Sequence, residues 1–151
     1  MLNFKTMMAR RARKKVSAFS LSASAFSSGA TAPKQSEGGQ SSAFDRILLD
    51  APCSNTGVLR RRVDLRWRIS EAEISRLQRT QLDLLKLAAT KLKPGGVLVY
   101  STCSLEPEEN SEVVEQFLAA NAGFKLETQR QLFPFAEGVD GAYVARLKKS
   151  T

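Results

Sequence analysis

Two short apolar runs, FDRILL at 44–49 and VLVYS at 97–101, have the length and composition of buried strands. Between them, Ser70 and Glu73 have the spacing of a capping box, which predicts that a helix begins there. LKPGG at 92–96 carries the proline and glycines that end such a helix. The apolar positions of the segment recur at helical spacing and predict one buried face: Ile74, Leu77, Leu84, Leu85, Ala88 and Leu92.

The order strand, helix, strand predicts a βαβ unit, in which the two strands are parallel. The segments Asp50–Cys53 and Ser101–Cys103 then leave the sheet at the same carboxyl edge. Neighbouring strands lie about 5 Å apart, and open α/β sheets bind ligands at this edge. The two cysteines of the chain are therefore expected to be neighbours, although fifty residues separate them.

The rest of the pattern predicts a helix and a second pair of strands. Pro107 suits a first helical turn, and EVVEQFLAA at 112–120 supplies an apolar face. FKLET at 124–128 and AYVARLK at 142–148 have strand character, and the turn-rich link between them predicts a closing antiparallel pair. The predicted fold class is α/β.

Charge separates the chain into two parts. The net charge is +8, yet residues 1–36 hold seven Lys/Arg and no acid, which leaves 16 basic and 15 acidic residues for the remainder. We expect 1–43 to be a basic, Ser/Arg-rich disordered or targeting segment, and 44–151 to be the folded domain. A transit peptide would indicate a mitochondrial or plastid protein. A plain tail, or a mistaken translation start, would leave a cytoplasmic or nucleolar location.

Composition narrows the classes of function. A hydrophobic fraction of 42% with 25% charged residues is typical of a soluble globular domain, and no apolar run reaches the length of a membrane span. Two cysteines without any histidine argue against a disulfide scaffold and against a zinc site. A catalytic role is a further option for these cysteines, because a thiolate is a strong nucleophile when positive charge or a helix N-terminus stabilises it. A buried structural role and a redox dithiol are the alternatives for the pair.

The stretches FDRILLDAPCSNTGVLRRRVDLRW and LVYSTCSLEPEEN resemble the two signature motifs of the RsmB/NOP-type RNA (cytosine-5) methyltransferases. The resemblance covers 44–149, the C-terminal half of the family's catalytic domain, and implies part of a Rossmann-like sheet that uses S-adenosyl-L-methionine. It implies that Cys103 adds to carbon 6 of a cytosine and that Cys53 assists product release. It places Asp50 at the boundary of cofactor and target base, and it implies rRNA or tRNA as the partner.

Five arginines lie within nine residues of the first motif, and Trp67 lies among them: Arg60, Arg61, Arg62, Arg66 and Arg68. Phosphate contact by Arg60, Arg61 and Arg62, with Trp67 stacking a base or bracing the loop, is the functional interpretation. A solvated loop with a core tryptophan is the alternative. The acidic group Glu106, Glu108 and Glu109 is expected to be charge at a helix start rather than a metal site.

Family members carry a Gly-rich cofactor loop before the segment that matches FDRILL, and no such loop precedes Phe44 in this sequence. The expectation is therefore that the chain is a truncated methyltransferase, inactive by itself. A noncatalytic RNA-binding fragment is the second hypothesis. A redox protein ranks last because the cysteines are not in a CxxC arrangement.

Overall fold

The computed structural model describes residues 44–151, and the predicted disordered or targeting segment 1–43 lies outside the described residues. Its helices and strands are β1 (Phe44–Asp50), α2 (Glu71–Lys91), β2 (Leu92–Thr102), α3 (Ser111–Ala120), β3 (Phe124–Leu132), α4 (Pro134–Glu137) and β4 (Ala142–Lys149). Three short 3-10 helices lie in the loops: η2 (Thr56–Val58), η3 (Val63–Trp67) and η4 (Pro107–Glu109).

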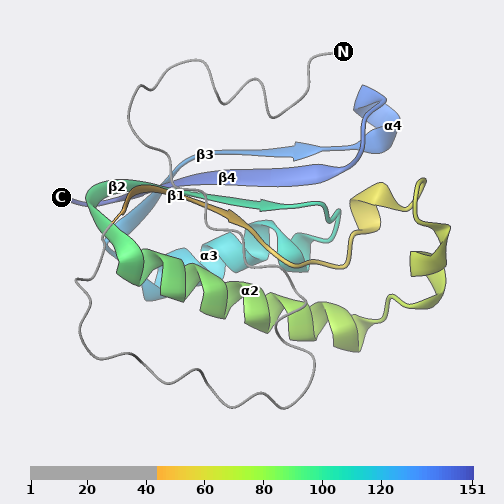
Figure 1. The fold of residues 1–151 in the computed structure, drawn as a ribbon, viewed down its shortest axis with the longest axis horizontal. Coiled ribbons are helices and arrows are strands. Elements are labelled where there is room, and N and C mark those ends of the chain that lie inside the picture. The colour runs from red at the N-terminus through yellow and green to blue at the C-terminus, as the bar shows by residue number, and fades with distance from the viewer. Residues whose placement is uncertain (1–43) are drawn as a thin grey trace.

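The strands of the described part form one sheet in the order β1-β2-β4-β3. β1 and β2 are parallel, whereas β4 is antiparallel to both β2 and β3. Helices α2 and α3 lie together on one face of the sheet (Figure 1). The predicted βαβ unit, the closing antiparallel pair and the α/β class are thereby confirmed.

Helix α2 begins as predicted, but half of the expected capping box does not form. Ser70 is the N-cap, and its hydroxyl accepts the backbone N–H of Glu73 at 3.3 Å. The Glu73 carboxylate does not return to Ser70; it pairs with Arg76 at 2.6 and 2.8 Å. The guanidinium of Arg76, three residues further along the same helix face, offers two charged N–H donors. It therefore binds the Glu73 carboxylate more strongly than the single backbone N–H of Ser70 would.

Strand β2 begins five residues earlier than the predicted 97–101. Helix α2 ends at Lys91, and the strand follows at once. Its first residues are irregular, since the register with β1 shifts between Phe44 and Arg46 and Gly95 has a positive φ of 70°. Gly95 is held at the sheet by its N–H, which donates to Ser150 O at 3.1 Å. Proline and glycines thus end the helix and at the same time bend the chain into the strand.

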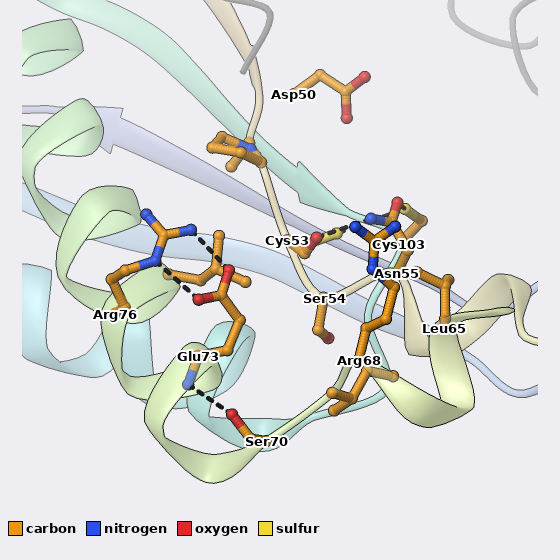
Figure 2. A pocket seen from close by; sticks show the side chains of 14 residues that line it. Asp50, Cys53, Ser54, Asn55, Leu65, Arg68, Ser70, Glu73, Arg76 and Cys103 are labelled. Carbon is orange, nitrogen blue, oxygen red and sulfur yellow. Dashed lines mark hydrogen bonds and ion pairs between the residues drawn. The ribbon is translucent and has the colours of Figure 1, made fainter. Parts of the chain in front are cut away.

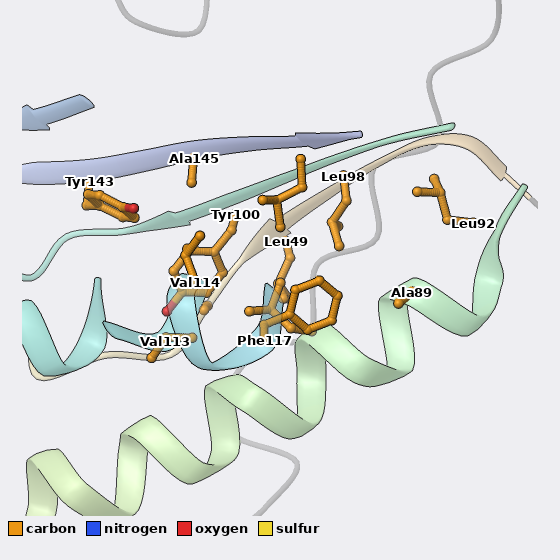
Figure 3. Close-up of a cluster of buried hydrophobic side chains, with 13 residues drawn as sticks. Leu49, Ala89, Leu92, Leu98, Tyr100, Val113, Val114, Phe117, Tyr143 and Ala145 are labelled. Carbon is orange, nitrogen blue, oxygen red and sulfur yellow. The ribbon is translucent and has the colours of Figure 1, made fainter. Parts of the chain in front are cut away.

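The core fills the space between the sheet and the two helices (Figure 3). Leu85 of α2, Leu98 of β2, Phe117 of α3 and Leu147 of β4 are completely buried. Each such side chain contributes roughly 1.5–3 kcal/mol through burial of apolar surface. The buried face of α2 also contains one polar residue. Gln81 lies between Leu77 and Leu85 and is completely buried. Within residues 44–151, no helix is long and apolar enough to cross a membrane.

Candidate active site

Two loops meet at the carboxyl ends of β1 and β2. Asp50 and Ser101 are register partners, so the loops that follow them leave the sheet side by side. Ala51 N–H donates to Ser101 O at 2.9 Å, and Gly57 N–H donates to Cys103 O at 2.9 Å. The predicted neighbourhood of the cysteines is confirmed, since Cys53 Sγ lies 3.4 Å from Cys103 Sγ and both are free thiols.

The two thiols differ in how they hold a proton. The hydrogen bond with Cys53 lowers the pKa of Cys103, in spite of the burial of Cys103 and the negative charge of Asp50, both of which raise it. The same hydrogen bond and its own burial raise the pKa of Cys53 far above the ordinary range. Of the two thiols, Cys103 is therefore the one that ionises more readily.

Asn55 contacts both cysteines, although it was not among the predicted site residues. It is the single non-glycine residue with a positive φ, 61°, among residues 44–151. Its Nδ2 donates to Cys53 O at 2.8 Å, which turns Oδ1 toward the Cys103 sulfur, also at 2.8 Å. In this orientation the carbonyl accepts the proton of a neutral Cys103 thiol, so it opposes the ionisation that Cys53 favours.

A buried carboxylate lies behind the two loops. Glu109 is completely buried, and it accepts the backbone N–H of Ser54 at 2.9 Å and the hydroxyl of Ser104 at 2.6 Å. The Ser54 hydroxyl and Gln81 Nε2 complete its four donors. Glu109 lies in the first turn of η4, as predicted, but this turn directs its side chain inward, whereas Glu108 beside it is exposed.

A cavity of about 690 Å³ opens beside the sulfurs, between the first loop, η3 and the start of α2 (Figure 2). Asp50 is at its edge, exposed and set apart from the two sulfurs, and its Oδ1 accepts the Ser101 hydroxyl at 3.2 Å. Arg68, which belongs to the predicted basic patch, and Arg76, which was not predicted, also line the cavity. No cluster of three His, Cys, Asp or Glu suited to a metal occurs in the described part of the chain.

Of the five arginines in the basic loop, only Arg68 lines this cavity. Arg60 and Arg61 both pair with Asp140, at 2.6 and 3.0 Å, while Arg62 lies 3.5 Å from Asp64. All three arginines remain about half exposed or more. Trp67 is 89% exposed, which excludes the alternative of a core tryptophan.

The fold is shared with solved methyltransferase structures, which places the chain among the methyltransferases with a Rossmann-like sheet. Two of these structures illustrate the likeness. A methyltransferase homolog protein from Pyrococcus horikoshii has a TM-score of 0.59 and 33% identity, over 71% of this chain and 39% of its own. NSun6 from the same organism, solved with SFG, has a TM-score of 0.61 and 33% identity, over 70% and 30%.

The sequence places the chain more narrowly. The profile of the 16S rRNA methyltransferase RsmB/F family matches residues 11–148, and the chain belongs to that family. Ribosomal RNA small subunit methyltransferase B of Pasteurella multocida is 47% identical over 116 residues, which cover 70% of this chain. The protein of that name in Shewanella oneidensis is 43% identical over 122 residues, or 74% of this chain. The chain spans about a quarter of the length of these curated relatives, 26% and 28%.

Proposed function

We propose that this chain carries the cysteine half of an S-adenosyl-L-methionine-dependent RNA (cytosine-5) methyltransferase that acts on rRNA or tRNA. The observation that supports this most strongly is the pair of thiols with opposite pKa shifts. Their sulfurs lie 3.4 Å apart, just after the ends of two parallel strands. A structural pair of buried cysteines would need neither the adjacent cavity nor a thiol with a lowered pKa.

Each cysteine then has a defined task. The Cys103 thiolate forms a bond to carbon 6 of the cytosine, and the electron pair of the 5,6 double bond moves to carbon 5, which becomes nucleophilic. After methylation, water accepts the carbon 5 proton, the electron pair of that C–H bond re-forms the 5,6 double bond, and the Cys103 sulfur leaves as a thiolate with the pair of the C6–S bond. The Cys53 thiol is 3.4 Å away and donates a hydrogen bond to the departing thiolate, which favours release.

Asp50 is the residue of the described part that fits a role toward cofactor and base. Its carboxylate is exposed at the edge of the cavity and accepts a single hydrogen bond, so most of its acceptor capacity is open to ligand N–H or O–H groups. A volume of about 690 Å³ is in the usual range for small-molecule sites. S-adenosyl-L-methionine, when bound, supplies an electrophilic methyl group.

The basic loop supports an RNA partner. Arg60, Arg61 and Arg62 keep exposed guanidinium groups, and Trp67 presents nearly its whole surface. Exposed arginines suit phosphates, and an exposed indole suits the face of an unpaired base.

Covalent trapping tests the proposal. RNA that contains 5-azacytosine is incubated with the full chain, and a complex stable in denaturing gels is sought. We expect an adduct with the native chain and none with Cys103→Ala. With ordinary cytosine RNA, where release can occur, Cys53→Ala should give a longer-lived adduct than the native chain. Absence of any adduct, with salt-sensitive RNA binding intact, would support the second candidate, a noncatalytic RNA-binding fragment. Calorimetric titration with S-adenosyl-L-methionine measures separately whether residues 1–151 bind the cofactor.

A further inference from the structure

The buried Glu109 has a chemistry that structural packing alone does not require. A carboxylate taken out of water loses favourable solvation, and a cation usually compensates for part of this loss. Among the described residues no Lys or Arg pairs with Glu109. Four hydrogen-bond donors replace the cation, two to each oxygen. An ionised carboxylate is acceptor-only, so it satisfies all four donors at once.

The donors show what the carboxylate holds together. Ser54 follows Cys53 directly in the chain, and Ser104 follows Cys103 directly. Both serine hydroxyls donate to the same oxygen, Oε2, so one atom joins the residues adjacent to the two sulfurs. The hydroxyls also lie 3.2 Å from each other.

The attachment of the two loops to Glu109 is unequal. The Ser54 loop has two links, through its backbone N–H and its hydroxyl. The Ser104 loop has one direct link, through the hydroxyl. The carbonyl of Ser104 is held by Asn110 and Gln131 instead.

Glu109 is itself held at both its backbone and its side chain. Tyr100 is completely buried in β2, and its hydroxyl donates to the Glu109 backbone carbonyl at 2.6 Å. Gln81 of α2 donates to Glu109 Oε1 at 3.1 Å and to Pro52 O at 2.8 Å. Glu109 is thus fixed to the sheet through Tyr100 and to the helix layer through Gln81.

We propose that Glu109 is a positioning residue, which sets the spacing of Cys53 and Cys103 by binding Ser54 and Ser104 in the two cysteine loops. The spacing serves the addition and release steps of the proposed function, but the proposal can be tested without RNA or cofactor. Its failure is therefore distinguishable from failure of the proposed function.

Phenylarsine oxide is a suitable probe, because trivalent arsenic binds two thiols that are close together. The aryl-arsenic oxide and two S–H groups give two As–S bonds and one water, with no change in oxidation state. Affinity for the folded full chain is measured by competition with 2,3-dimercaptopropanol, and the unfolding free energy is measured in parallel with urea. A residue with only a structural role would lower the unfolding free energy and leave arsenic affinity in the folded chain unchanged.

We expect Glu109→Ala to weaken arsenic binding at least tenfold and the matched exposed variant Glu108→Ala to leave it unchanged. If Glu109→Ala does not fold, the serine variants decide. Ser104→Ala removes the single direct link of its loop and is expected to weaken binding at least threefold. Ser54→Ala keeps its backbone link and should have a smaller effect. Equal arsenic affinity in folded Glu109→Ala or in Ser104→Ala, or no binding by the native chain, would overturn the proposal.

Discussion

Replacement of Gly57 by alanine should damage the fold and the site together, because three loops meet at this residue. A Cβ at position 57 would lie 2.5 Å from Gly141 O and 2.7 Å from Cys103 O. Both are backbone atoms, so neither can move away as a side chain does. The shorter distance is roughly 0.9 Å inside ordinary contact, and overpacking of this kind costs about 1–3 kcal/mol.

Hydrogen bonds add to this cost. Gly57 N–H donates to Cys103 O at 2.9 Å, and Gly57 O accepts Gly141 N–H at 2.8 Å. Relief of the clash requires these backbones to separate, which weakens two bonds of about 1 kcal/mol each. We expect Gly57→Ala to lower the unfolding free energy by about 3 kcal/mol.

Urea denaturation followed by circular dichroism measures the change. Gly123→Ala is the matched control, since a Cβ there meets nothing within 4 Å. That substitution should be neutral or stabilise by about 0.4–1 kcal/mol, through the unfolded state. A Gly57→Ala chain within 0.5 kcal/mol of the native one would refute the reasoning from close backbone contact.

Three further outcomes are expected. Cys53→Ala removes the hydrogen bond that lowers the pKa of Cys103, so alkylation of Cys103 by iodoacetamide should become half-maximal at a higher pH and slow down at neutral pH; an unchanged pH profile would contradict this. Phe117→Ala empties a completely buried site and should cost about 3–5 kcal/mol in urea unfolding; a loss below 1 kcal/mol would contradict the packing described. Arg62→Gln should lower the slope of log affinity against log salt for single-stranded RNA by about 0.7, whereas Lys86→Gln, exposed on α2, should not; equal slopes would argue against phosphate contact.

The sequence was sufficient to predict the sheet and the meeting of the cysteines. Apolar runs, a capping serine and a glycine stop define a βαβ unit, and the parallel strands of that unit bring Cys53 and Cys103 to one edge. That inference needs only the order of the elements, not their detailed packing. The prediction was therefore insensitive to the misplaced start of β2 at Leu92.

The supporting residues could not be predicted in the same way. Glu106, Glu108 and Glu109 are equivalent in sequence, and the turn of η4 decides which one is buried. Gln81 lies on the apolar face of α2, where a sequence pattern shows only an isolated polar residue and gives no sign of its hydrogen bonds. Asn55 offered one usable signal, because asparagine tolerates a positive φ better than most residues. Its contact with the Cys103 sulfur depends on a hydrogen bond to Cys53 O that exists only in the folded chain.

The pairing of Asp50 with Ser101 has a consequence for how the chain tolerates change in length. Cys53 lies three residues after Asp50, and Cys103 lies two residues after Ser101. One extended residue spans about 3.3 Å, nearly the whole distance between the sulfurs. Deletion or insertion of one residue between Asp50 and Cys53, or between Ser101 and Cys103, would therefore separate the two thiols even if every other side chain were kept. Loop length is as much a part of this site as the cysteines are.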